Sequence, residues 1–259
     1  MLSIIYEDNE LLVINKPAGL VCHPTKGDVY SSLISRVRLH LGASSRPHFI
    51  NRLDRETSGL VLLAKNPDTA GELCDIWEKR SVRKDYLAIV KGHVREDAGI
   101  IDAPLGKDQL SIVAIKNKVR EDGAPATTAF AVLRRFTREQ RQFSLLAVQP
   151  LTGRKHQIRI HLAYRDHPIV GDKIYGGDEE LYLAFVQGRL SDSQRRELIL
   201  ANHALHAREV RFHWRGGDFL FQAEPEAWFP EFTLNAVERQ GSAPLRSIEA
   251  TDVDRQRPT

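Results

Sequence analysis

Residues 50–60, INRLDRETSGL, place a carboxylate, Asp54, between two arginines and ahead of a Thr-Ser-Gly turn. If residues 50–54 are extended, the side chains of Ile50, Arg52 and Asp54 point to the same side of the chain, where they could face a ligand. The hydroxyl groups and the glycine that follow suit a tight turn that holds a carboxylate in place. Taken alone, this pattern is more typical of a turn with a surface ion pair than of a catalytic site.

A second segment, residues 150–163, follows a predicted strand with a concentrated set of hydrogen-bond donors. These donors are Arg154, Lys155, His156, Gln157, Arg159 and His161. Guanidinium groups bind phosphate and carboxylate through paired hydrogen bonds, so the segment suits recognition of such anions. A metal site is not expected, because the two histidines lack the four-residue helical spacing of zinc ligands and have no neighbouring glutamate.

Tyr86 belongs to a third segment, residues 84–92, KDYLAIVKG, which reads as a strand with alternating side chains. A tyrosine in a strand more often packs in the core or at an edge than acts on a ligand. Tyr86 is therefore a candidate site residue only when it is considered together with the other two segments, residues 50–60 and 150–163.

Composition and charge bound the class of protein. The chain has 259 residues, of which 42% are hydrophobic and 27% charged, as is typical of a folded globular protein. The formal net charge is only +3, but Lys and Arg gather in residues 78–84, 134–141 and 153–161. Such patches either meet a polyanion or are solvated faces of helices and strands.

We expect a cytoplasmic protein without a membrane span. No apolar run approaches the roughly 20 residues of a transmembrane helix. The N-terminal sequence MLSIIYEDNE lacks the features of an export signal. Cys22 and Cys74 show no spacing typical of a metal or redox site, so we interpret both as reduced packing residues.

Apolar periodicity predicts more strands than helices. Strands are expected at residues 2–7, 10–17, 60–65, 84–92, 127–136, 143–150, 205–214 and 218–225. Helices are expected at residues 29–42, closed by Gly42, and at residues 66–80, where Asn66 can cap and Pro67 can begin the helix. Because helices and strands do not alternate regularly, we predict an α+β fold with a mixed sheet and flanking helices.

Five stretches, taken together, resemble the RluA family of RNA pseudouridine synthases. In chain order they are NKPAGLVCHP, RLDRETSGLVLLAK, KDYLAIVKG, PLTGRKHQIRIHLA with HPIVGDKIYG, and NHALHAREVRF. They span most of residues 4–215, and the Arg-Leu-Asp-x-x-Thr-Ser-Gly core is highly specific. The resemblance implies the pseudouridine synthase catalytic fold: a mixed, mostly antiparallel sheet with flanking helices and loops, and a central RNA cleft.

The resemblance also implies roles for three residues in catalysis. Asp54 matches the essential aspartate, Tyr86 the tyrosine that stacks near the uracil, and Arg159 the basic residue that pairs with the aspartate. An ion pair with Arg159 would favour the ionised carboxylate.

Further positions match RNA-contacting residues of the family. Arg52 matches the arginine that can fill the gap left by a flipped base, and Leu205 resembles the apolar residue that packs against the target base. The family usually has histidine where this chain has Asn51, which leaves the contribution of that position to loop geometry or RNA contact open. The remaining candidate RNA-binding residues are Arg154, Lys155 and His156.

The implied reaction detaches uracil from C1′ of its ribose and rejoins it through C5, so it needs no cofactor, metal or energy donor. Asp54 could attack C1′ as a nucleophile or remove the C2′ proton to give a glycal, and the sequence does not choose between the two. The target base must leave its stack, which is easiest in a loop or bulge of RNA. Glu56 is poorly placed to be the second carboxylate of a glycosidase.

We expect one catalytic domain at residues 1–236, a mobile tail at residues 237–259 and no S4-type RNA-binding domain ahead of the catalytic part. Residues 106–126 are expected to be a polar loop or a solvated hairpin. The expected partner is a stem-loop of ribosomal or transfer RNA, and the chain is expected to be a monomer. The alternative is a non-catalytic RNA-binding protein on the same scaffold.

Overall fold

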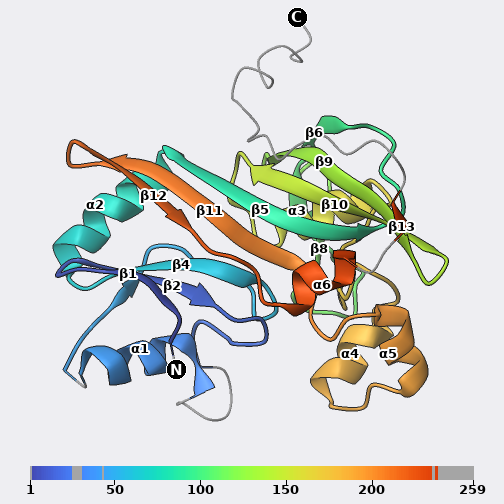
Figure 1. The fold of residues 1–259 in the computed structure, drawn as a ribbon, viewed down its shortest axis with the longest axis horizontal. Coiled ribbons are helices and arrows are strands. Elements are labelled where there is room, and N and C mark those ends of the chain that lie inside the picture. The colour runs from blue at the N-terminus through green and yellow to red at the C-terminus, as the bar shows by residue number, and fades with distance from the viewer. Residues whose placement is uncertain (1, 25–30, 43, 235–236, 239–259) are drawn as a thin grey trace, which may run out of the picture. The chain divides into compact units, whose positions relative to one another are not determined.

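The computed structural model of the chain describes residues 2–24, 31–42, 44–234 and 237–238 (Figure 1). The chain divides into two compact units, residues 1–86 with 205–227 and residues 87–204 with 228–259. The boundary falls inside β5 (Val82–Lys91). The region predicted as one domain, residues 1–236, thus contains two units that are each built from separated stretches of chain.

The first unit contains a mixed sheet in which most strand pairs are antiparallel. Its strands are β1 (Ile4–Glu7), β2 (Leu11–Lys16), β3 (His48–Phe49), β4 (Ser58–Ala64), β11 (Leu205–Trp214) and β12 (Gly217–Gln222). The order is β1-β2-β4-β11, with β12 beside β11 and β3 beside β4. Only the β4–β11 pair among these is parallel in the described part of the unit. The expected α+β class and mostly antiparallel sheet are confirmed.

Two helices of the first unit have the ends that the sequence predicts. In α1 (Leu33–Leu41), the Ser32 side chain caps the first turn and Gly42, at φ 99°, ends the helix. In α2 (Pro67–Glu78), proline occupies the first turn and the Asn66 side chain accepts a backbone hydrogen bond. The first two residues of the predicted helix 29–42 lie outside the described residues.

The central strands of this unit are buried on both faces. Along β2, Leu11 and Val13 join a core cluster that includes residues of α2, whereas Leu12 and Ile14 join a second cluster that includes residues of α1. Side chains of a strand alternate between faces, so a strand covered by a helix on each side is apolar throughout. Burial of each of these side chains contributes roughly 1.5–3 kcal/mol. Figure 1 shows α1 and α2 on opposite sides of this sheet.

The glycine of the Thr-Ser-Gly turn lies where two backbones meet. Gly59 pairs with Ala207 in the parallel register of β4 and β11 and has a φ of 109°. A Cβ atom at this position would lie 2.2 Å from the Ala207 carbonyl oxygen. Beside it, the Ser58 hydroxyl lies 2.9 Å from Nδ1 of His206. Glycine is therefore required here by backbone conformation and by close approach.

The second unit is built on a long hairpin. β9 (Thr127–Arg138) and β10 (Arg141–Pro150) are antiparallel, and both residues of the turn between them have positive φ. The strands β6 (Ala98–Asp102) and β13 (Val237–Glu238) pair with β9, and β7 (Leu105–Lys107) pairs with β8 (Asn117–Val119). The last pair confirms the hairpin alternative for residues 106–126.

Four helices in or beside the second unit were not predicted from the sequence. They are α3 (Gln157–Tyr164), α4 (Glu180–Val186), α5 (Asp192–Leu198) and α6 (Trp228–Leu234). In α3 the first six residues are all buried, polar and apolar alike, so the helix carries no apolar stripe. The other three have seven residues each, about two turns, which is too short for a clear period.

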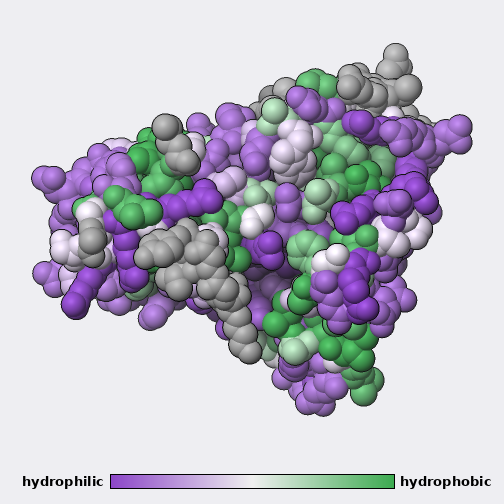
Figure 2. All heavy atoms as spheres, turned by 90° about the horizontal axis from the view of Figure 1, so that it is seen from below, coloured by the Kyte–Doolittle hydropathy of each residue, from purple (hydrophilic) through white to green (hydrophobic). Residues whose placement is uncertain are grey.

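Of the predicted tail, Val237–Glu238 form β13, and residues 239–259 lie outside the described residues. Among the helices that the structure describes, none has both the length and the apolar composition needed to cross a bilayer. On the face seen in Figure 2, hydrophobic atoms form separate groups between hydrophilic ones.

We predict that Gly59→Ala lowers the free energy of unfolding by about 3 kcal/mol, because the new methyl group meets the backbone of Ala207 at a positive φ. Urea denaturation of the full chain measures this change.

Gly71→Ala is the matched control. Gly71 lies inside α2 and a Cβ atom there meets nothing within 4 Å, so alanine should raise stability by about 0.5–1 kcal/mol. Equal effects of the two substitutions would contradict the close approach of β4 and β11.

Candidate active site

Asp54 lies in a turn between β3 and β4, not in an extended segment. No strand is present at residues 51–57, and the backbone N–H of Thr57 donates to the Asp54 carbonyl at 3.2 Å. Ile50 is buried whereas Arg52 is exposed and Asp54 is half-buried. The printed turn begins at Asp54, and Ile50 differs in burial from Arg52 and Asp54, so a shared face of these three side chains stays a prediction.

Three bonds tie this turn to the segment that follows β2. The ammonium of Lys16 donates to the Arg55 carbonyl at 3.1 Å, and Nε of Arg55 donates to the Gly19 carbonyl at 3.2 Å. The Cys22 thiol lies 3.4 Å from the Leu53 carbonyl. The turn residues on both sides of Asp54 are thus bound to NKPAGLVC, the first of the five sequence stretches, by two of its side chains and one of its carbonyl groups.

Lys16 is a residue of the Asp54 surroundings that the sequence analysis missed. Its side chain is fully buried, and its Nζ also donates to the carbonyls of Pro17 at 3.0 Å and Leu20 at 2.9 Å. Burial lowers the pKa of Lys16 to about 8, a shift that the negative charge of Asp54 opposes. The sequence signal for a buried lysine was its position at the end of the largely apolar strand LLVINK.

Tyr86 lies within the electrostatic field of Asp54. It packs against the core cluster that holds Leu12 and Ile14 of β2. Burial, and after it the charge of Asp54, raise the pKa of Tyr86 to about 12. Two of the predicted catalytic residues, Asp54 and Tyr86, are therefore brought together in the first unit, with Lys16 as a third member.

Asn51, which replaces the usual histidine, is bound to the backbone of β4. Its amide nitrogen donates to the Leu60 carbonyl at 3.0 Å, and its amide oxygen accepts from the Leu62 N–H at 2.8 Å. These two bonds give Asn51 a structural role at the start of the Asp54 turn.

Arg52 and Leu205 differ in exposure. The Arg52 side chain is exposed and makes no hydrogen bond or ion pair with any residue that the structure describes. Leu205, the first residue of β11, is 5% exposed, so only its edge can reach a ligand.

In the second unit, the predicted donor cluster is split between surface and interior. Arg154 and Lys155 are exposed, and His156, at φ 57°, places Nδ1 at 2.9 Å from the Tyr175 hydroxyl. Gln157 and His161 are buried and make structural hydrogen bonds to β9 and its surroundings. Half of the set, Gln157, Arg159 and His161, is therefore buried in α3, and anion recognition by the exposed part stays a prediction.

Arg159 forms a buried, bidentate ion pair with Asp172. Its Nε and Nη2 lie 2.7 and 2.8 Å from the two carboxylate oxygens, and the residues are 4% and 1% exposed. Burial opposes ionisation of Asp172, but the charge and hydrogen bonds of Arg159 hold its pKa below the usual value. The backbone N–H groups of Ile174 and Tyr175 also donate to Asp172, at 2.9 and 3.0 Å.

No group of three or more His, Cys, Asp or Glu side chains is arranged to hold a metal ion within the described ranges. At Asp54, the charge of the carboxylate acts on the phenol of Tyr86 and on the ammonium of Lys16.

We predict that Lys16→Met lowers the free energy of unfolding by roughly 3 kcal/mol near neutral pH, because buried carbonyl groups lose their charged donor. The folded pKa of about 8 lies below the usual lysine value of roughly 10.4, so the unfolded chain binds more protons between these values. The Lys16 contribution to stability therefore rises with pH in that window.

Chemical denaturation of wild type and variant, from about pH 7 to about pH 10, measures the difference. Lys79→Met, at a lysine that is 73% exposed, is the control and should change stability little at any pH. A difference between wild type and Lys16→Met that stays constant over the window would contradict the buried charge.

We predict that Asp172→Asn lowers the free energy of unfolding by about 3–5 kcal/mol, because it leaves the Arg159 charge buried without its carboxylate. Asp122→Asn, which breaks the exposed ion pair with Arg120, should change stability little in the same denaturation experiment. Similar effects of both substitutions would argue against the internal ion pair.

The family comparison comes from sequence. A family model described as RNA pseudouridylate synthase matches residues 10–164. An RNA pseudouridine synthase of Bacillus subtilis is 34% identical over 244 residues, which are 92% of this chain and 72% of the relative. The ribosomal large subunit pseudouridine synthase D of Nitrosomonas europaea is 38% identical over 178 residues, which are 68% of this chain but 50% of the relative.

Solved structures agree with this result. Human RNA pseudouridylate synthase domain containing 1 is similar over 100% of this chain and 96% of its own, with a TM-score of 0.73 and 26% identity. Human RNA pseudouridylate synthase domain containing 4 gives a TM-score of 0.67 and 28% identity. The resemblance inferred from the five sequence stretches is confirmed, and the chain belongs to the RluA family of RNA pseudouridine synthases, a family of isomerase enzymes.

Proposed function

We propose that this chain isomerises specific uridines in structured RNA to pseudouridine, with Asp54 as the essential carboxylate. The observation that carries the proposal is the fixed turn: three bonds join the residues on either side of Asp54 to the end of β2 and the segment that follows it. The relatives add support, since the Nitrosomonas europaea protein is named for the large ribosomal subunit. The proposed substrate is ribosomal RNA, transfer RNA or both.

The proposed chemistry begins with an ionised Asp54. The positive charge of Lys16, whose pKa responds to Asp54, stabilises that carboxylate in turn, because the interaction is mutual. Asp54 then either attacks C1′ of the uridine or removes the C2′ proton to form a glycal. In both routes the bond from C1′ to N1 of uracil breaks, the base rotates and C5 bonds to C1′. As this bond forms, the ester bond from Asp54 to C1′ breaks in the first route, or the C2′ proton returns in the second. The C5 proton then leaves and N1 ends protonated, so product and substrate are isomers. No electrons are gained or lost overall.

Tyr86 supplies the surface on which the base rests. With a pKa of about 12, its phenol is neutral at physiological pH and can stack on uracil as an uncharged ring. Stacking of one base on an aromatic side chain contributes roughly 1–3 kcal/mol, which offsets part of the cost of flipping it out of the RNA.

The RNA strand is held by residues at the periphery. Arg52, exposed and without a partner in the described part of the chain, is suited to fill the gap left by the flipped base. Arg154 and Lys155 are exposed and suited to phosphate contacts, with His156 beside them, and Leu205 packs against the base.

Arg159 keeps its proposed role as the cationic partner of Asp54. Its bonds to Asp172 use Nε and Nη2 and hold the guanidinium plane in one orientation. A guanidinium whose plane is fixed in this way is suited to act on a second carboxylate. The pairing itself is taken from the family resemblance.

The proposed enzyme acts in the cytoplasm as a monomer and needs no cofactor, because the reaction neither oxidises nor activates its substrate. Residues 1–236 are proposed to contain the whole catalytic domain.

We predict that Asp54→Asn abolishes release of tritium from RNA labelled at uridine C5 but leaves RNA affinity within about threefold, since the change removes a charge and little volume. Binding is measured with the same RNA in a filter assay. A non-catalytic RNA-binding protein would release no tritium even as the wild type.

Asp75→Asn is the matched control, at an aspartate on α2 that is 67% exposed, and it should release tritium at the wild-type rate. Undiminished turnover of Asp54→Asn would overturn the assignment of Asp54.

A further inference from the structure

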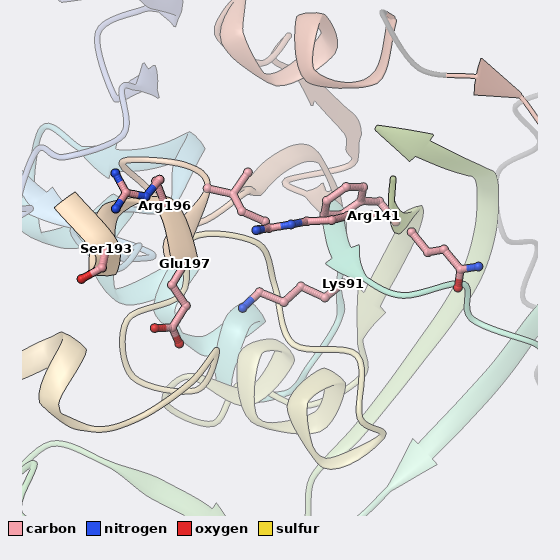
Figure 3. Close-up of a pocket in the computed structure, with 8 residues that line it drawn as sticks. Lys91, Arg141, Ser193, Arg196 and Glu197 are labelled. Carbon is pink, nitrogen blue, oxygen red and sulfur yellow. The ribbon is translucent and has the colours of Figure 1, made fainter. Parts of the chain in front are cut away.

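A basic pocket of about 480 Å³ lies in the second unit, beside α5 (Figure 3). Lys91 from the end of β5 and Arg141 from the start of β10 line one side of it, and Arg196 and Glu197 of α5 line the other. Figure 3 shows Lys91 and Arg141 extending side by side toward α5. None of these residues belongs to the five sequence stretches except Lys91.

Two of the cations in this pocket lack an internal partner. Arg141 and Arg196 are exposed and make neither a hydrogen bond nor an ion pair through their side chains with any residue in the described ranges. Most other arginines of this unit are bound: Arg135 to Asp97, Arg165 to Glu96 and Arg159 to Asp172. Unpaired guanidinium groups that converge on a hollow suit an anionic ligand.

Lys91 adds a third positive charge to the lining of the pocket. Its Nζ donates to the Gly176 carbonyl at 2.8 Å, which fixes its position. Burial lowers its pKa, and Arg141 adds to this shift, whereas the carboxylates of Glu197 and, more weakly, of Asp172 oppose it. Three cations therefore face one carboxylate, and an added anion would relieve the repulsion between Lys91 and Arg141.

The basic surface continues into an adjoining pocket of about 460 Å³, which shares Arg141 and Arg196. It adds Arg138, Arg195 and one carboxylate, Glu139, which lies 3.9 Å from Nε of Arg138. The Arg138 guanidinium lies 4.9 Å from the centre of the Phe232 ring and donates to backbone carbonyls of α6. A continuous row of cations matches a chain of phosphates better than a single small anion, and Glu197 disfavours a multiply charged one.

We propose that these two pockets form a docking site for the phosphodiester backbone of the RNA, separate from the residues that surround Asp54. This inference rests on the proposed function, because its ligand is the RNA substrate of that function. The family match ends at residue 164, whereas α5 spans Asp192–Leu198, so this half of the site lies outside the part shared with the family model. The site gives the chain a means of selecting RNA beyond its catalytic residues.

The test measures binding of the full chain to a fluorescein-labelled RNA stem-loop over a range of KCl concentrations. Arg141→Gln and Arg196→Gln should each reduce the slope of log K against log salt by about 0.7–0.9, the value for one lost phosphate contact. The double variant should bind roughly tenfold more weakly at low salt.

Arg165→Gln is the control, because Arg165 is an exposed arginine of the same unit that is paired with Glu96 and lines neither pocket. It removes the same charge and should leave slope and affinity close to wild type. Slopes of the Arg141 and Arg196 variants equal to that of Arg165→Gln would overturn the proposal. Thermal melting checks that each variant is folded, and Arg141→Gln alone carries the test if the α5 variant is not.

Two further experiments distinguish RNA from a small anion as the ligand of the pockets, and distinguish failure of this proposal from failure of the proposed function. Inorganic phosphate at millimolar concentration should displace little RNA. Phosphate binding that depends on Arg141 and Arg196, together with wild-type salt slopes for RNA in both variants, would show a small-anion site and overturn RNA docking. The double variant should still release tritium when enzyme and RNA are saturating. If the wild type releases none, the proposed function fails, while the salt slopes still decide whether the pockets bind RNA.

Discussion

The buried ammonium of Lys16 is the interaction on which the candidate active site depends. Its three carbonyl partners belong to the segment after β2 and to the turn that carries Asp54, so one charged group holds two pieces of chain that are far apart in sequence. Burying a charge is costly unless hydrogen bonds and a counter-charge compensate, and here backbone carbonyls and the field of Asp54 do so. The same arrangement places an anion next to a neutral phenol at Tyr86, which suits a carboxylate that acts on a flipped base.

The second unit also buries a positive charge, but there the charge is compensated by an ion pair and not by backbone carbonyl groups. Arg159 and Asp172 are both almost completely buried, and backbone N–H groups saturate the carboxylate. Around them, the side chains of Gln157 and His161 form hydrogen bonds with β9, so the buried helix α3 carries polar side chains that are bonded inside the second unit. Such a network orients the guanidinium rigidly, and rigid orientation is what a catalytic cation needs.

Electrostatics divides the basic residues into two classes. Those with internal partners, such as Arg159 and Arg135, stabilise the fold, whereas Arg52, Arg141 and Arg196 keep their guanidinium groups available in the described structure. This division explains why a chain with a net charge of only +3 can still bind a polyanion. Binding of a polyanion depends on local positive charge, which is provided by the arginines without internal partners.

The sequence by itself determined the features that depend on neighbours along the chain: the caps Asn66 and Gly42, the doubly apolar strand β2, and the Arg-Leu-Asp motif that marks the family. These follow from local backbone preferences and from periodicity. Only the tertiary structure decided that Asn51 binds β4, that α3 is a helix, and that Lys16 holds the turn that carries Asp54. Partners that lie dozens of residues apart leave no periodic trace in the sequence, because burial and hydrogen bonding between them arise only when the chain is folded.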